Sequence, residues 1–197
     1  MIKKTRVQDS VLTYGHMNLI FRARNLWRDL VLWSRVYLTS RLGGIGITED
    51  VFNRIYRIPL EFGDIIRFIF GNQAAETIVQ QLSSNVILYR ELVEAMISGD
   101  NEAASAITQQ LYVNADQRAA FMASINPFWD ETQWKNLIYT FYNYSFQEII
   151  SILTNDPGNV ALFDRFLQYT DIMGDYFAQG LYNYLAYNTV PAPAGSA

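Results

Sequence analysis

Residues 25–40 of the chain, NLWRDLVLWSRVYLTS, decide the fold class. Apolar side chains recur there at Leu26, Leu30, Trp33 and Tyr37, and this spacing predicts an amphipathic helix. No proline or glycine interrupts the stretch, and the pair Gly43-Gly44 follows where a helix C-cap belongs. Because two tryptophans on one helix need a large core to bury them, we expect this helix to lie at the centre of the fold.

The composition is that of a globular chain. Half of the 197 residues are hydrophobic and only 17% are charged, which is too apolar for a disordered chain and suits one domain. Aromatic residues reach 15%, and aromatic side chains are favoured at protein–protein interfaces as well as in cores. No apolar uncharged run is long enough for a transmembrane helix, so we expect no membrane span. The chain has no cysteine, which excludes disulfides and thiolate metal sites and leaves the compartment open between cytosol, cell surface and spore.

The pattern along the chain predicts an all-α fold, an up-and-down four-helix-type bundle with additional short helices and extended terminal arms. We expect an N-terminal arm at residues 1–17, a helical bundle domain at residues 18–187 and a C-terminal tail at residues 188–197. The four long helices lie at about 18–42, 73–98, 100–125 and 159–187. The last of them carries an apolar face that we expect to be buried: Leu162, Phe166, Tyr169, Ile172, Met173, Tyr176 and Phe177.

Three local signals predict helix breaks. Pro59 should divide the region between Thr48 and Phe70, because a proline inside a helix lacks a backbone donor and clashes with the preceding turn. Residues 114–116, Asn-Ala-Asp, form a candidate interruption of the 100–125 helix. A capping box, Ser145-Phe-Gln-Glu148, predicts that a new short helix begins within the element that starts near Asp130.

The net charge of −4 conceals an asymmetry between the two parts of the chain. Residues 1–41 hold eight Lys or Arg and two acids, a net charge of +6, whereas residues 42–197 carry −10. A basic head on an acidic body can attract nucleic acid, anionic lipid or the body of a second subunit. Pairing of the first helix with acidic neighbours within the same chain is the simplest interpretation, and we favour it.

The sequence contains no recognisable catalytic, cofactor-binding or metal-ligating set, and we predict that the protein is not an enzyme. Residues 43–46, Gly-Gly-Ile-Gly, follow a helix and lack the Lys-Ser/Thr of a phosphate-binding loop. His16 is the only histidine and falls in the polar arm, so we do not expect it to act as a base. Arg35 is expected to be partly buried and paired with one of the acids that otherwise resemble solvated faces and caps: Asp116, Glu148, Asp164, Asp171 and Asp175.

Several short motifs resemble a family of small all-helical proteins of unknown function from spore-forming bacteria. The resemblance spans roughly residues 26–185 and is carried by Leu26-Trp27-x5-Trp33-Ser34-Arg35, Gly99-Asp100, Tyr112-x-Asn114-Ala115-Asp116, Asn126-Pro127-Phe128-Trp129 and Met173-Gly-Asp175-x4-Gly180. Some members are labelled acetylglutamate kinase, an activity that nothing in this sequence supports.

The resemblance also implies what this chain has lost. Members of that family carry histidines on the bundle face, and the matching positions here are Leu30, Asn85 and Phe141. If those histidines hold a metal in the relatives, this chain kept the scaffold without the metal site.

These observations lead to three hypotheses of function. The first is a non-enzymatic, self-assembling structural protein, a surface, spore-layer or filament subunit whose arms contact neighbouring subunits. The second is a helical bundle that binds a small ligand in its interior and derives from a metal-binding ancestor. The third, which the acidic body and the sequence pI of about 5.0 disfavour, is binding of nucleic acid through Arg22, Arg24 and Arg28 with the basic residues of the arm.

Overall fold

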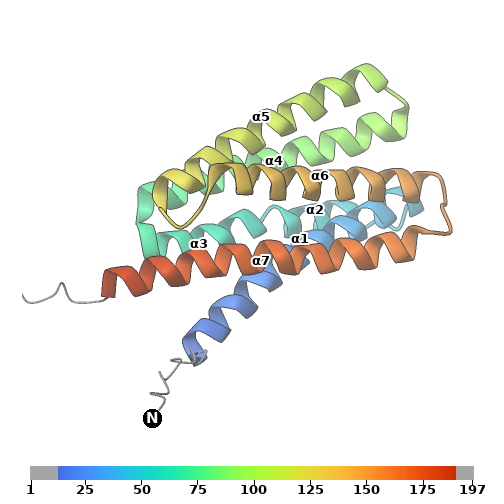
Figure 1. Ribbon diagram of the computed structural model, residues 1–197. Helices are drawn as coiled ribbons and strands as arrows, with labels where there is room; N and C mark the ends of the chain where they lie inside the picture. The colour runs from blue at the N-terminus through green and yellow to red at the C-terminus, as the bar shows by residue number, and fades with distance from the viewer. Residues whose placement is uncertain (1–12, 190–197) are drawn as a thin grey trace, which may run out of the picture.

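The computed structural model describes residues 13–189, and within that range the chain forms helices and no strand. The all-α fold class is thereby confirmed for the described part of the chain. Seven helices follow one another (Figure 1): α1 (Tyr14–Gly43), α2 (Thr48–Ile55), α3 (Ile58–Phe70), α4 (Asn72–Ser98), α5 (Asn101–Ile125), α6 (Glu131–Leu153) and α7 (Asn159–Thr189).

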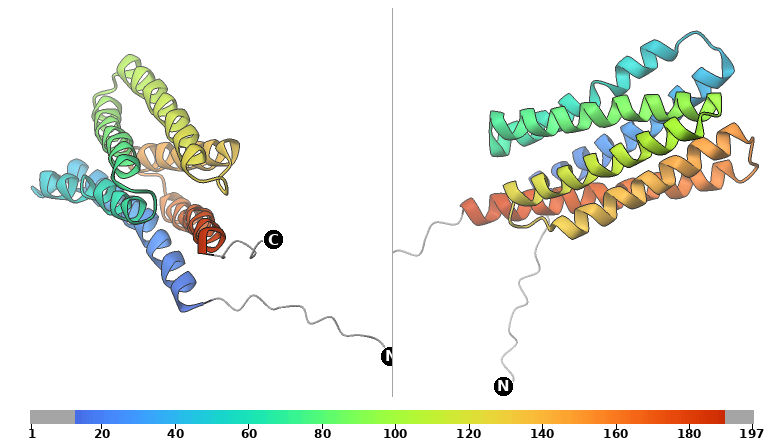
Figure 2. Two further views of the ribbon diagram at one scale, coloured as in Figure 1. Left: turned by 90° about the vertical axis from the view of Figure 1, so that its left-hand side faces the viewer. Right: turned by 90° about the horizontal axis from the view of Figure 1, so that it is seen from above.

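Helices that are consecutive in the sequence pack against one another, and α7 returns to pack along α1. α4 and α5 form a hairpin on one side of the molecule, while α1, α3 and α7 lie on the other (Figures 1 and 2). α1 contacts α2, α3, α6 and α7, which supports the central position expected for it. The N-terminal turns of α1 diverge from the neighbouring helices and extend beyond them.

α1 begins earlier than its sequence suggested. Residues 14–17, which we predicted to end the N-terminal arm, form its first turn because the Thr13 side chain accepts a hydrogen bond from the His16 backbone N–H. At the other end, Gly44 adopts a left-handed conformation, with φ of 63°, and caps the helix as expected. The remaining residues of both predicted arms, 1–12 and 190–197, lie outside the described range.

Pro59 divides the 48–70 region as predicted, and it occupies the first turn of α3, where its missing N–H costs nothing. The other two predicted breaks are wrong. α5 continues through Asn114 without a break. The Asn114 side chain donates to the backbone carbonyl of Gln81 on α4 at 3.0 Å, so it does not compete for the backbone hydrogen bonds of its own helix. α6 runs unbroken through Ser145 and Glu148, because the Glu148 carboxylate pairs with Arg35 and does not cap a helix.

With α6 continuous, residues 13–189 contain five helices of 23 or more residues, one more than the four predicted. The predicted face of α7 is largely correct, since Leu162, Phe166, Met173 and Phe177 are buried. Ile172 is the exception, at 54% exposed. The predicted apolar face is wide, and Ile172 lies at its edge, where the side chain meets solvent.

Two glycines of α7 explain part of the motif around residues 173–180. A Cβ on Gly174 would lie 2.7 Å from Arg24 Cα, so the backbones of α1 and α7 meet there without a side chain between them. A Cβ on Gly180 would lie 1.8 Å from Trp129 Nε1. Trp129 fills that space and stacks on Phe177 with ring centroids 5.4 Å apart. These motif residues therefore serve packing.

Replacing Gly174 with alanine should destabilise the protein by about 1–3 kcal/mol, because the new methyl group forces α1 away from α7. Gly15→Ala is the matched control: Gly15 is a helical glycine of α1, and its added Cβ would meet only Thr13 Oγ1 at an ordinary van der Waals distance of 4.0 Å, so we expect it to be neutral or stabilising by up to about 1 kcal/mol. Urea denaturation measures both. Equal stabilities of the two variants would contradict the close approach.

Candidate functional site

The outward face of α1 carries an apolar stripe, which we define as Tyr14, Met17, Phe21, Leu32 and Val36. Spacings of three, four and eleven residues place these side chains on one side of a helix. All five are exposed, with Tyr14 at 82% and Phe21 at 54%. The stripe faces away from core residues of the same helix such as Ala23 and Trp27. Asn25 and Arg28 occupy the same face between Phe21 and Leu32, so the stripe consists of two exposed apolar groups, and these mark a candidate interaction surface.

Beside the stripe lies a groove of about 700 Å³ between α1, α3 and α7, which we call the end groove. Leu19, Ile65 and Phe68 contribute apolar walls, and Phe68 is 88% exposed. Arg22 and Asp64 bring opposite charges to the same groove. The end groove and the N-terminal part of the stripe therefore occupy the same end of the molecule.

His16 is not in a polar arm, contrary to our expectation. It lies in the first turn of α1, where its ring stacks on Tyr182 of α7 with centroids 3.8 Å apart, and only 8% of the residue is exposed. Its Nε2 has no hydrogen-bond partner within residues 13–189. The ring thus packs α1 against α7 at the wall of the end groove.

An interior cavity of about 30 Å³ brings together the three positions that the family resemblance singled out. Leu30 of α1, Asn85 of α4 and Phe141 of α6 all line it. Their convergence supports the interpretation that these positions share one bundle face. Roughly 10–15 Å³ of such space holds one water molecule, so this cavity accommodates a guest of one or two heavy atoms and excludes an ordinary organic ligand.

Polar groups line one side of this interior cavity. Asn85 donates to the Tyr142 hydroxyl at 2.5 Å, and Arg118 donates to the same oxygen at 3.0 Å. Tyr89 also lines the cavity, and its burial raises the pKa of its hydroxyl. Sequence reasoning missed Arg118, which is only 5% exposed, because an arginine within a helical pattern looks like part of a solvated face.

Arg35 is partly buried and paired, as predicted. Its partner at the edge of the interior cavity is Glu148, whose side chain is 4% exposed, and Arg35 also donates to Asn159. The guanidinium lies 4.2 Å from the centroid of the Phe163 ring. Burial raises the pKa of Glu148, although Arg35 and Asn159 oppose the shift. The pair links α1, α6 and α7 and is a structural ion pair.

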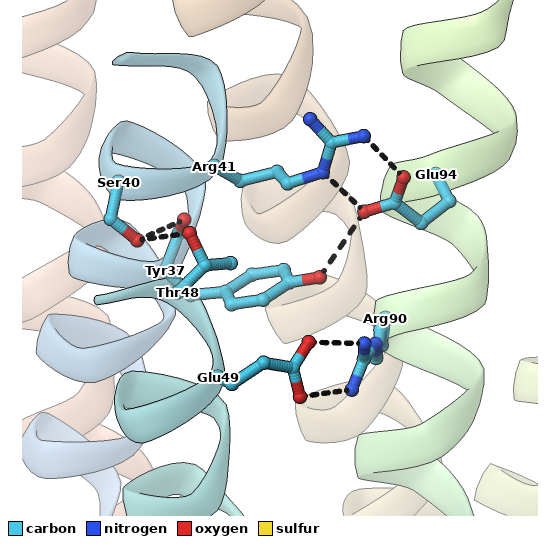
Figure 3. A network of polar contacts seen from close by, with 7 residues as sticks. All are labelled: Tyr37, Ser40, Arg41, Thr48, Glu49, Arg90 and Glu94. Carbon is cyan, nitrogen blue, oxygen red and sulfur yellow. Dashed lines mark hydrogen bonds and ion pairs between the residues drawn. The ribbon is translucent and has the colours of Figure 1, made fainter. Parts of the chain in front are cut away.

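A second polar network joins α1, α2 and α4 (Figure 3). Arg41 donates to both carboxylate oxygens of Glu94 at 2.8 Å, and Tyr37 donates to Glu94 at 3.4 Å. Arg90 reaches across to Glu49 with donor–acceptor distances of 2.5 and 3.1 Å. Hydrogen bonding from Arg41 lowers the pKa of Glu94, whereas burial and the nearby Glu94 charge raise the pKa of Tyr37 to about 12. Because every charged member faces an opposite charge, the network clamps the helices together.

The basic residues of α1 are largely neutralised by acids of the same chain, as we favoured. Arg24 forms a bidentate pair with Asp175 at 2.6 and 2.7 Å, and Arg28 pairs with Asp171. These contacts occupy two of the three arginines considered for nucleic acid. Of the other acids singled out in the sequence, Asp116 accepts from the Tyr139 hydroxyl at 2.7 Å.

Within residues 13–189, no group of three or more His, Asp or Glu residues is arranged to hold a metal ion. Asp164 takes part in no such group.

None of the helices between residues 13 and 189 combines the length and apolar character needed to cross a bilayer.

Comparison with known proteins gives no evidence on the family or function of this chain. No family model matches the chain, and neither the curated proteins nor the solved structures yield a match. The resemblance to small helical proteins of spore-forming bacteria therefore stays a prediction based on the short motifs.

Removing one member of the buried ion pair should be far more costly than removing one member of an exposed pair. Arg35→Met leaves Glu148 buried without its partner, and we expect a loss of about 3–5 kcal/mol in the free energy of unfolding. Arg24→Met, in the exposed pair with Asp175, should cost no more than about 1 kcal/mol. Urea denaturation at neutral pH gives both values, and similar losses would show that burial does not distinguish the pairs.

Glu94 and Glu148 should shift stability in opposite directions with pH. The lowered pKa of Glu94 means that its contribution is present above its reference value of 4.5 and is lost as the pH falls through the lowered pKa. The raised pKa of Glu148 means that its contribution is present below 4.5 and is lost as the pH rises through the raised pKa.

The advantage of wild type over Glu94→Gln should accordingly shrink on acidification, whereas its advantage over Glu148→Gln should shrink on alkalinisation. Urea denaturation between about pH 3 and pH 8 records both profiles. Parallel profiles for the two variants would contradict the assigned environments.

Proposed function

We propose that this protein is a non-enzymatic structural subunit that assembles with further copies of itself through the outward face of α1. The observation that carries the proposal is the apolar stripe, which lies on the helix that diverges from its neighbours and borders the end groove. Subunits of a surface layer, a spore layer or a filament are the corresponding classes of protein. In this proposal the protein is an up-and-down helical bundle in which one face of α1 is exposed at the surface.

A second copy is the partner that this end of the molecule suits. A twofold axis would place the stripe of each copy against the end groove of the other, so that one surface supplies both sides of an isologous interface. Arg22 forms no ion pair with an acid among the described residues, and Asp64 pairs only with Arg67 of its own helix. Across such an axis, Arg22 of one copy faces Asp64 of the other, which makes the charges complementary as well.

The segments 1–12 and 190–197 adjoin this surface in the sequence, because α1 begins at Tyr14 and α7 ends at Thr189. Lys3, Lys4 and Arg6 make the first of these segments basic, while the body of the protein is acidic. In the proposed assembly these terminal segments contact neighbouring subunits and extend the interface beyond α1.

A small ligand in the bundle interior is the second candidate function. The meeting of Leu30, Asn85 and Phe141 at one cavity favours it, because an inherited site would leave its positions together. The volume of about 30 Å³ restricts the guest to a very small species. We rank this candidate below assembly, since apolar and bulky side chains occupy two of the three positions.

Phe21→Glu should reduce the assembled state to monomers of about 23 kDa, because a charge in the middle of the stripe must lose its hydration on association. Size-exclusion chromatography with light scattering measures the molar mass over a concentration series. Val113→Glu is the matched control: Val113 is a comparably exposed apolar residue, at 56%, on α5, and its replacement should leave the mass unchanged. A wild-type protein that stays monomeric throughout would refute self-assembly.

A further inference from the structure

A further groove lies between α2 and the α4–α5 hairpin, and we call it the acidic groove. Its volume is about 650 Å³. Phe52 of α2, Ile87 of α4 and Ile107 of α5 contribute apolar wall, and Ile87 is 42% exposed. The acidic groove shares no residue with the end groove. It therefore offers apolar surface to a partner at a place that the proposed contact through α1 does not use.

Three carboxylates and one guanidinium line the acidic groove, those of Glu91, Glu94, Asp100 and Arg90. Arg90 and Glu94 are already paired within the polar network of Figure 3. Among residues 13–189, Glu91 has no partner, and the Asp100 side chain accepts only the Ala103 backbone N–H. Two negative charges of the groove are therefore left without a countercharge, and this surface suits a basic partner.

The chain itself contains a segment of matching character. Residues 1–12, MIKKTRVQDSVL, lie outside the described range, and we call them the N-terminal segment. The segment holds three basic residues and one acid, and the apolar side chains of Ile2 and Val7 flank the basic run. It thus combines positive charge with apolar groups, as the acidic groove combines negative charge with apolar wall.

The length of the N-terminal segment favours the groove of another copy over its own. The acidic groove lies near the end of α1, because Arg41 reaches Glu94 at the groove wall, whereas the segment joins α1 at its start (Figure 1). α1 has 30 residues, so its two ends are about 45 Å apart. Twelve residues span only about 40 Å even when fully extended. The segment therefore cannot both cover that distance and occupy the groove of its own subunit.

We propose that the N-terminal segment of one copy binds in the acidic groove of another. The basic side chains of the segment face Glu91 and Asp100, and its apolar side chains cover Ile87. This inference rests on the proposed function, because it names the surface of the neighbouring subunit that the segment contacts. The segment and the groove are different surfaces, so the contact is heterologous and extends an assembly instead of closing it. Such a contact suits a filament or a layer.

The first test titrates full-length protein into a fluorescently labelled peptide of residues 1–12 and follows the fluorescence anisotropy. We expect saturable binding that weakens as the salt concentration rises, because exposed charges are screened. Glu91→Lys should raise Kd about tenfold, since the reversal replaces an attraction with a repulsion. Glu76→Lys is the matched control: Glu76 is also exposed and lies on α4, but it does not line the groove, so Kd should stay unchanged.

Two results of this titration would overturn the proposal. One is the absence of saturable binding to the wild-type protein. The other is an equal Kd for Glu91→Lys and Glu76→Lys, which would assign the binding to overall charge. A second peptide, in which Lys3, Lys4 and Arg6 are replaced by glutamine, should bind at least about tenfold more weakly.

The second test asks whether the contact joins two copies of the whole protein. A carbodiimide links a lysine amine to a carboxylate that it touches, and an equimolar mixture of isotopically light and heavy protein is treated with it. Mass spectrometry should find Lys3 or Lys4 linked to Glu91, with the light and heavy isotopes combined in one cross-linked peptide. Cross-links of a single isotope only would place the segment in the groove of its own subunit and would overturn the proposal.

This contact and the contact through α1 fail separately. A twelve-residue contact is weak alone and gains strength when the α1 contact presents several segments and grooves together. Phe21→Glu should therefore separate the subunits in chromatography and still bind the peptide with the Kd of the wild type, because Phe21 does not line the acidic groove. An assembled wild type that does not bind the peptide would refute the segment contact and leave the α1 contact in place.

Discussion

The contact on which the fold depends is the close approach of α1 and α7, the first and last helices of the chain. It exists because Gly174 has no side chain, so the backbone around Arg24 can lie directly against α7. Arg24 and Arg28 then reach Asp175 and Asp171 on α7. The contact closes the sequence of helices that otherwise pack each on the next. It also turns the basic side of α1 toward acids and leaves the apolar stripe facing outward.

The sequence predicted the fold class and most helix ends because those depend on local signals. A helical apolar period, a left-handed glycine at residue 44 and a proline in the first turn of α3 act within a few residues of themselves. The errors arose where a distant partner overrides a local preference. Ser145 and Glu148 have the spacing of a capping box, yet Glu148 is taken by Arg35 from a helix more than a hundred residues away. Asn114 is likewise held by α4.

The candidate sites were less predictable for the same reason. Tyr14, Met17 and Phe21 have a helical spacing, but exposure of that face follows from the angle at which α1 leaves its neighbours, which no local pattern encodes. The positions Leu30, Asn85 and Phe141 were identified through a family resemblance, and only the packing of three helices brings them to one cavity. Arg118 was missed altogether, because its burial depends on where α5 lies relative to α4 and α6.

The interior and the surface of this protein differ in how far their side chains find partners within the chain. In the core, most buried charges and hydroxyls are satisfied by named partners, and the two internal cavities hold about 30 and 20 Å³, too little for an organic substrate. The interior therefore serves the stability of the bundle, as the buried Arg35–Glu148 pair illustrates. Most of the basic residues of α1 are likewise engaged within the chain, which leaves few free for a polyanion. The apolar stripe on the outward face of α1 takes part in none of these internal contacts, so the proposed association with another copy would bury apolar surface that folding leaves exposed.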